Sequence, residues 1–164
     1  MPTDPQALCQ TTEAYLHAQI PITRAMGVGI ESYEAHTGHL VLTAPLETNH
    51  NHLGTAFGGS LSALCTLAGY ALLWLDLEGQ SREEEAGTHT SKPHVVVKES
   101  TISYLHPVKE PLIRVVCERP DAALMQSFHR QFTQKGKARI QLTCTVTENA
   151  QTCVRFTGTY VAVR

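Results

Sequence analysis

The spacing of hydrophobic residues predicts a helix and then a pair of strands in the first third of the chain. Apolar and small residues recur every three or four positions over residues 5–20, and Pro21 ends the run, which is typical of a helix. Residues 28–33 and 39–44 are short extended runs joined by a turn-rich segment. Two such runs predict a β-hairpin.

The middle of the chain contains its most apolar segment, residues 60–77. The apolar residues surround almost the whole helical wheel, so this helix has to be wrapped by other structure. Gly79 is expected to end it. The charged residues 80–92 that follow are poor in apolar side chains and are expected to form a mobile loop.

The second half of the chain is mostly extended. Residues 95–105 are rich in β-formers, and three later runs, 113–118, 139–147 and 154–160, alternate apolar and polar side chains. Such alternation predicts an antiparallel sheet with one buried face and one wet face. Residues 121–135 break the alternation and predict a helix capped by Asp121, ended by Gly136, with Leu124, Phe128 and Phe132 on its apolar face.

These elements together predict an α+β fold. About six strands form one curved antiparallel sheet that wraps around the long apolar helix, and the extra helix lies between the fourth and fifth strands. Residues 1–20 are an N-terminal helical segment and residues 21–164 form the domain. One sheet and one helix leave the edges of the sheet and the ends of the helix uncovered, so we expect the chain to associate with itself.

Composition narrows the class of protein. A length of 164 residues suits one domain, and 13 basic against 15 acidic residues without a basic run argue against nucleic acid or an acidic membrane surface as a partner. Residues 1–10 lack the features of a signal peptide, and the apolar stretch 61–75 is shorter than the roughly 20 residues that span a bilayer. The 5 scattered cysteines, with no C-x-x-C pair, indicate reduced thiols and a cytoplasmic protein.

The segment that carries chemistry is a polar loop, residues 47–55, which delivers Gly58 and Gly59 to the first turn of the apolar helix. The first amides of a helix have no intrahelical partner, and the helix dipole there favours negative charge. Glycine lets a carbonyl approach closely, and a thioester carbonyl becomes an oxyanion during attack. Alternatively, the two glycines only let the helix pack against the sheet, with Thr55 as a simple cap.

A resemblance favours the first interpretation. The run N-x-x-G-T-x-x-G-G, from Asn51 to Gly59, resembles the loop of hotdog-fold thioesterases of the acyl-CoA and phenylacetate-pathway type, and residues 102–107 (I-S-Y-L-H-P) resemble their central strand. From about Ile20 the chain is most similar to a bacterial family of thioesterase domains that occur alone or fused to the C-terminus of a GNAT-type acetyltransferase. Its marks are I-P-I-T-R-A-M-G-V, N-H-x-G-T-A-F-G-G-S-L, the helix at 121–135 and a closing G-T-Y-V-A.

The resemblance implies a set of roles. The acyl group would lie along the central helix at an interface between two subunits, as a homodimer or a dimer of dimers. The Gly59 amide would polarise the thioester carbonyl, and Asn51 would orient the nucleophilic water or the carbonyl. CoA or phosphopantetheine would enter as part of the substrate, an acyl-CoA or an acyl carrier protein, with no separate cofactor. The remaining substrate-binding residues would be Gly54, Thr55, Phe57, Gly58 and Ser60.

Two positions depart from the wider family pattern. Phe57 stands where a histidine is usual, and Thr66 stands where the catalytic aspartate or glutamate is usual. A nucleophilic water needs a proton acceptor, and the candidates are Thr66, His52 and Glu99 from a facing subunit. Three of the candidate site residues have a structural alternative: an Asx turn for Asn51, a hydrogen bond to the preceding helical turn for Thr66, and a solvated position for Glu99.

The sequence therefore leaves three functions in competition. The first is an acyl thioester hydrolase, and the second is an acyl-thioester binding module without chemistry, which the missing helix carboxylate favours. A hydratase or dehydratase ranks last because the proline-rich active-site pattern of those enzymes is not seen. His50 and His52 lack the third ligand that a zinc site needs, so no metal is expected.

Overall fold

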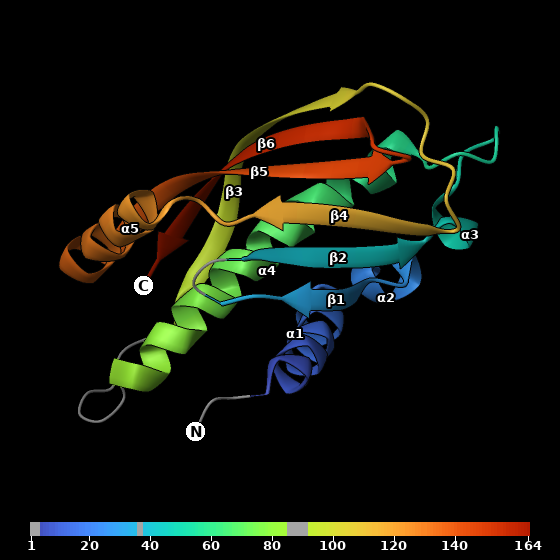
Figure 1. The fold of residues 1–164 in the computed structure, drawn as a ribbon. Helices are drawn as coiled ribbons and strands as arrows, with labels where there is room; N and C mark the ends of the chain where they lie inside the picture. The colour runs from blue at the N-terminus through green and yellow to red at the C-terminus, as the bar shows by residue number, and fades with distance from the viewer. Residues whose placement is uncertain (1–3, 36–37, 85–91) are drawn as a thin grey trace.

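A computed structural model describes residues 4–35, 38–84 and 92–164 of the chain. The elements follow in the order α1 (Pro5–Gln19), α2 (Ile22–Met26), β1 (Gly29–Tyr33), β2 (His39–Pro45), α3 (Leu46–Asn49), α4 (Gly58–Glu84), β3 (His94–Tyr104), β4 (Leu112–Glu118), α5 (Ala122–Lys135), β5 (Lys137–Glu148) and β6 (Gln151–Val163). The fold is α+β, as predicted (Figure 1).

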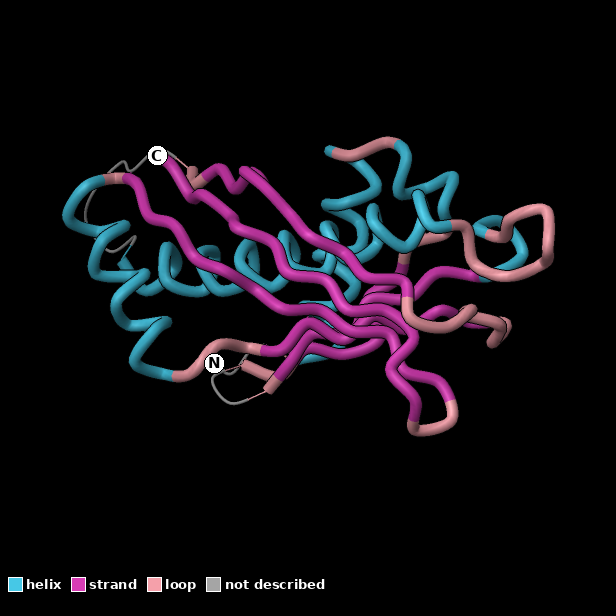
Figure 2. Tube along the Cα trace, turned by 90° about the horizontal axis from the view of Figure 1, so that it is seen from above, coloured by secondary structure: helices cyan, strands magenta, loops and turns pink. Residues whose placement is uncertain are grey.

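The strands form one open antiparallel sheet in the order β1-β2-β4-β5-β6-β3. Helix α4 lies across one face of this sheet and contacts five of its strands, β2 to β6, so the sheet wraps around the helix (Figures 1 and 2). Strands β1 and β3 form the two edges. The alternation that predicted one buried face is clear in β5, where every second side chain from Ala138 to Val146 is buried.

Helix α4 is the core of the domain, and one of its glycines is needed for packing. Leu64, Cys65, Ala68, Ala71 and Leu72 have no exposed surface. A side chain at Gly69 would lie 2.3 Å from the hydroxyl oxygen of the fully buried Tyr160, whose hydroxyl donates a hydrogen bond to the Thr66 carbonyl at 2.8 Å. The apolar stretch is longer than the 61–75 expected from the sequence: residues 58–79 are long and apolar enough to cross a membrane. Most of that segment is buried inside the domain, as expected for a core helix.

Helices α1 and α5 pack on different strands of the sheet. Helix α1 packs against β1 and reaches α4 through the stacked rings of Tyr15 and Trp74, whose centroids are 4.3 Å apart. Helix α5 packs against β5. Its predicted ends are confirmed, because the Asp121 side chain accepts a hydrogen bond from the Leu124 amide at 2.8 Å and Gly136 ends the helix in the left-handed conformation.

Four details of the prediction are wrong. The central helix passes Gly79 and continues to Glu84, because glycine with open space around it weakens a helix without ending it. The first part of the predicted mobile loop, residues 80–84, is therefore helical, and residues 85–91 lie outside the described part of the chain. The polar loop 47–55 begins inside α3. Leu124 is exposed, and Met125 takes its place beside Phe128 and Phe132 on the buried face of α5.

Strand β3 differs from the other strands because it is exposed on both faces. Among its residues Val95 is buried, whereas Val96, Val97 and Tyr104 are exposed hydrophobic side chains. The strand pairs with β6 along its whole length, and no strand formed by residues 4–35, 38–84 or 92–164 lies beside its other edge. An exposed apolar edge strand of this kind is a surface onto which another chain can add.

Candidate functional site

The loop before α4 is a compact hydrogen-bonded unit. Its start is fixed by Asn49, which is buried and donates from Nδ2 to the carbonyls of Met26 and Pro45, each at 2.8 Å. Its end is fixed by two backbone bonds, from the Phe57 amide to the Asn49 carbonyl at 2.8 Å and from the Ala56 amide to the Val108 carbonyl at 2.9 Å. The loop therefore holds the first turn of α4 in one place.

Asn51 shapes the interior of this loop. Its Oδ1 accepts from the amides of Leu53 at 2.9 Å and Thr55 at 3.3 Å, and its Nδ2 donates to the Thr55 hydroxyl at 3.0 Å. Gly54 takes the left-handed conformation that closes the turn, with φ of 76°. The Asx-turn alternative is therefore present in the structure. One of the two Nδ2 hydrogens has no hydrogen-bond acceptor within the described ranges, so the side chain keeps one donor.

In the part of the chain that the structure describes, the first amides of α4 have no capping group. The helix begins at Gly58, and its first backbone bond runs from the Leu61 amide to the Phe57 carbonyl at 3.0 Å. No acceptor among the described residues bonds the amides of Gly58, Gly59 or Ser60. Thr55, the expected cap, bonds Asn51 instead. Gly59 is an exposed residue, and its amide lies at the positive end of a long helix.

Two aromatic rings lie against the two glycines. A side chain at Gly59 would meet the Phe57 ring at 2.4 Å, so the ring occupies the space beside the Gly59 Cα. A side chain at Gly58 would meet the Tyr104 ring at 3.4 Å, an ordinary contact, and the Tyr104 hydroxyl donates to the Gly58 carbonyl at 3.0 Å. Tyr104 comes from the end of β3, and the pattern of the sequence did not assign it to the site.

The candidate bases are dispersed in the single chain. The Thr66 hydroxyl donates to the Ser62 carbonyl at 2.9 Å, which is the structural alternative foreseen for it. His52 is exposed on the loop, and Glu99 is exposed on β3, five residues before Tyr104 and therefore about 17 Å from it along the strand. Neither makes a hydrogen bond to another site residue in the described part of the chain. Within one chain, Glu99 is remote from the first turn of α4.

The structure gives no support for a nucleophilic cysteine or for a metal site among the described residues. The 5 cysteines are free and buried, and burial raises the pKa of the Cys65 thiol to about 12, which keeps it protonated. Across residues 4–35, 38–84 and 92–164 no group of three or more histidine, cysteine or acidic residues could hold a metal ion. His50 lies with its Nδ1 2.7 Å from the Asn51 carbonyl and is part of the loop.

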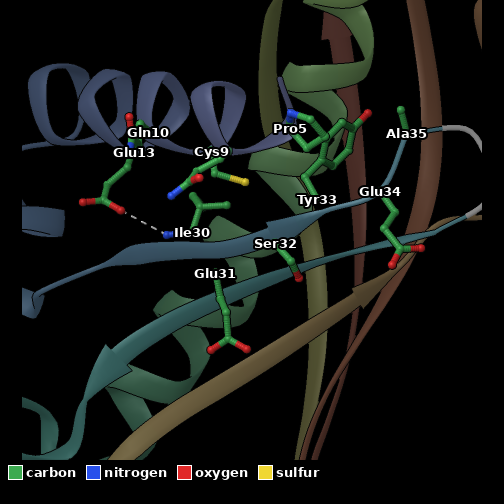
Figure 3. A pocket seen from close by; sticks show the side chains of 11 residues that line it. Pro5, Cys9, Gln10, Glu13, Ile30, Glu31, Ser32, Tyr33, Glu34 and Ala35 are labelled. Atoms are coloured by element: carbon green, nitrogen blue, oxygen red, sulfur yellow. Dashed lines mark hydrogen bonds between the residues drawn. The ribbon is translucent and has the colours of Figure 1, made fainter. Parts of the chain in front are cut away.

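A groove of about 800 Å³ lies between α1 and β1, and Cys9, Glu13, Tyr33 and Glu34 are among the residues that line it (Figure 3). Two of the carboxylates at this groove already bind groups of the protein: Glu13 accepts a hydrogen bond from the Ile30 amide at 3.2 Å, and Glu31 forms an ion pair with Arg114 at 2.8 Å. Strand β1 is the sheet edge opposite to β3, so the groove is separate from the glycines that Tyr104 contacts.

Asp76, the first acidic residue in the central helix, belongs to a buried polar cluster far from the glycines. Its carboxylate contacts the guanidinium of Arg119 and lies 2.6 Å from Nε2 of His129 on α5. Burial acts to raise the pKa of Asp76, but the hydrogen bonds from His129 and Arg119 and their charges outweigh it and lower the pKa. The cluster ties α4 to α5 and to the residue after β4.

The lowered pKa makes a prediction about acid stability. A carboxyl with a lowered pKa in the folded state adds stability above its ordinary pKa, and this contribution disappears as the pH falls through the folded-state value. We expect the unfolding free energy of the wild type, measured in urea from pH 7 to pH 3, to fall more steeply than that of Asp76→Asn in the acid range. Glu31→Gln, at an exposed pair, is the control and should follow the wild type; equal slopes for all three proteins would contradict the assignment.

Known structures resemble this fold over its whole length. A protein of unknown function from Chlorobaculum tepidum is 32% identical with a TM-score of 0.83, covering 98% of this chain and 96% of its own. A putative thioesterase from Shewanella oneidensis is 27% identical with a TM-score of 0.80, covering 97% and 99%. The Escherichia coli PaaI protein from the phenylacetic acid degradation operon shares the fold at 15% identity and a TM-score of 0.60, covering 98% and 96%.

The sheet wrapped around α4 is therefore the hotdog fold of thioesterases, as predicted. Residues 9–164 match the family described as putative thioesterase (yiiD_Cterm), and the chain belongs to that family. The match covers the domain and most of α1.

Proposed function

We propose that the protein hydrolyses an acyl thioester of CoA or of an acyl carrier protein, with the carbonyl oxygen held by the amide of Gly59. The observation that carries this proposal is the first turn of α4, where three successive amides have no acceptor among the described residues and Gly59 is exposed. Preorganised amide donors at a helix start stabilise the oxyanion that forms when a nucleophile attacks a thioester.

Asn51 is proposed to orient the attacking water or the carbonyl. Its Oδ1 is engaged by the loop, so the free Nδ2 hydrogen is the group available for this role. The proton acceptor is proposed to be His52 from the loop or Glu99 from a second copy of the chain. Thr66 is the weaker candidate because a hydroxyl group is a weak base by itself, and the bond that the Thr66 hydroxyl makes is to the Ser62 carbonyl within its own helix.

We propose that the working assembly is a homodimer or a dimer of dimers built on β3. Support comes from its two exposed faces, its open edge and the exposed side chains of Val96, Val97 and Leu105 beside it. A second copy added there would bring a second set of β3 side chains near α4, where the acyl chain is proposed to lie. The pantetheine arm is part of the substrate, and five reduced cysteines agree with a cytoplasmic location.

A binding module without chemistry is the second candidate. It is favoured by Thr66, which replaces the expected carboxylate and is engaged with its own helix. Such a module would hold the same carbonyl at the same amides but would release it unchanged.

An acyl-CoA panel distinguishes the two candidates. We expect thiol release from at least one chain length, followed with a thiol reagent, well above the rate of a Gly59→Val variant, because valine blocks access to the amide. If no chain length is turned over above that control, the hydrolase proposal fails. Saturable binding of acyl-CoA by calorimetry in the absence of turnover would then identify the binding module.

A further inference from the structure

We infer that Tyr104 is a positioning residue that fixes and polarises the peptide group whose N–H holds the thioester carbonyl. This inference rests on the proposed function and names a residue outside the loop motif. Its basis is the hydrogen bond from the Tyr104 hydroxyl to the Gly58 carbonyl oxygen, 3.0 Å long. The Gly58 carbonyl and the Gly59 N–H belong to one planar peptide group, so a bond to one end acts on the other.

The polarising effect follows from hydrogen-bond cooperativity. A donor at the carbonyl draws electron density toward the oxygen and leaves the N–H of the same peptide group more positive. Chains of hydrogen bonds strengthen one another by roughly 10–30% per bond. The Gly59 amide, which has no acceptor of its own in the described structure, is therefore a stronger donor toward a developing oxyanion while Tyr104 is bound.

The orienting effect follows from the two glycines. Glycine has the widest backbone freedom, and this peptide group has a glycine on each side at the uncapped end of a helix. The Tyr104 ring lies beside Gly58, 3.4 Å from the place that a Cβ on that residue would take, and the Phe57 ring occupies the space beside the Gly59 Cα. The two rings and the hydroxyl bond limit the rotation of the peptide plane, so the amide points in one direction before the substrate arrives.

Tyr104 is itself held by the sheet. It pairs with Val154 of β6, and the amides of Leu105 and His106, next along the chain, both bond the Cys153 carbonyl, at 2.8 and 3.1 Å. Its side chain is nevertheless 52% exposed, so it does not serve to fill the core. A rigid backbone that presents a half-exposed phenol to one carbonyl is what a positioning contact requires.

The test compares wild type, Tyr104→Phe and Tyr15→Phe in the acyl-CoA assay. Tyr104→Phe removes the hydroxyl alone and is expected to lower kcat by about 2- to 5-fold with KM little changed, because the Gly59 donor stays and loses only the strengthening and orientation that Tyr104 gives it. Tyr15→Phe removes a hydroxyl that bonds Tyr70 at 3.1 Å, away from the glycines, and should leave kcat unchanged. Unfolding midpoints of both variants report any loss of fold.

A second readout separates polarisation from packing. Fluorotyrosines at position 104 have more acidic phenols, and at a pH where they stay protonated kcat is expected to rise with phenol acidity. If the wild type turns over but Tyr104→Phe keeps its kcat, or kcat is insensitive to phenol acidity, the inference is overturned while the proposed function stands. If the wild type itself shows no turnover, the proposed function fails and the inference falls with it.

Discussion

Replacing Gly59 with alanine is expected to lower kcat/KM for an acyl thioester by about 100-fold, the range seen when an oxyanion donor is lost. The reason is access and not the amide itself, because alanine keeps the N–H. Its Cβ would lie 2.4 Å from the Phe57 ring, so the exposed ring has to leave its place beside the Gly59 Cα, and we expect it to obstruct the approach to the amide. Steady-state kinetics with the best substrate of the acyl-CoA panel measures the effect.

The neighbouring glycine provides a matched control. At Gly58 the added Cβ lies 3.4 Å from the Tyr104 ring, which is an ordinary contact. We therefore expect Gly58→Ala to keep activity within a few-fold of the wild type and to be as stable or slightly more so, since alanine favours the helix. The double variant Phe57→Ala with Gly59→Ala should recover part of the lost rate. Equal activities of Gly58→Ala and Gly59→Ala would contradict the assignment of the thioester carbonyl to the Gly59 amide.

Replacing Gly69 with alanine is expected to destabilise the fold by about 2 kcal/mol or more, the cost of overpacking a core and disturbing a buried hydrogen bond. The new Cβ would lie 2.3 Å from the Tyr160 hydroxyl oxygen. That ring is fully buried and its hydroxyl bonds the Thr66 carbonyl, so it has no free space to enter. Urea unfolding followed by circular dichroism measures the free energy.

Gly79→Ala is the control on the same helix. No atom of the described residues lies within 4 Å of a Cβ at Gly79, and the helix continues through it, so alanine is expected to stabilise the protein by up to about 1 kcal/mol. The two substitutions are chemically identical and should change stability in opposite directions. A destabilised Gly79→Ala, or a Gly69→Ala as stable as the wild type, would contradict the packing described for α4.

The fold could be predicted from the sequence because the hydrophobic pattern of each element agrees with the place of that element in the domain. The alternation in β5 and β6 follows from a sheet with one covered face, and the apolar surface of α4 follows from the five strands around it. The end of α4 could not be predicted in the same way. A glycine ends a helix only when the backbone turns left-handed, as it does at Gly136, and residue type alone does not report that at Gly79.

The site was less predictable than the fold. The position of a polar loop before a buried helix was enough to predict the two glycines and their open amides. The same loop contains two asparagines two residues apart, and the sequence alone does not show how their roles differ. The structure separates them: Asn49 is buried and anchors the loop, whereas Asn51 shapes it and retains one free donor. Tyr104 could not have been assigned, because 46 residues separate it from Gly58 and its contact depends on how β3 lies beside α4.

The most direct measurement is the crystal structure of the protein with an acyl-CoA analogue in which a methylene replaces the thioester sulfur, so that the carbonyl is kept and cannot be cleaved. We expect the carbonyl oxygen to lie about 2.7–3.1 Å from the Gly59 nitrogen, with the free Nδ2 hydrogen of Asn51 directed toward the same centre. A carbonyl bound elsewhere, with the amides of Gly58 and Gly59 still facing open solvent, would contradict it.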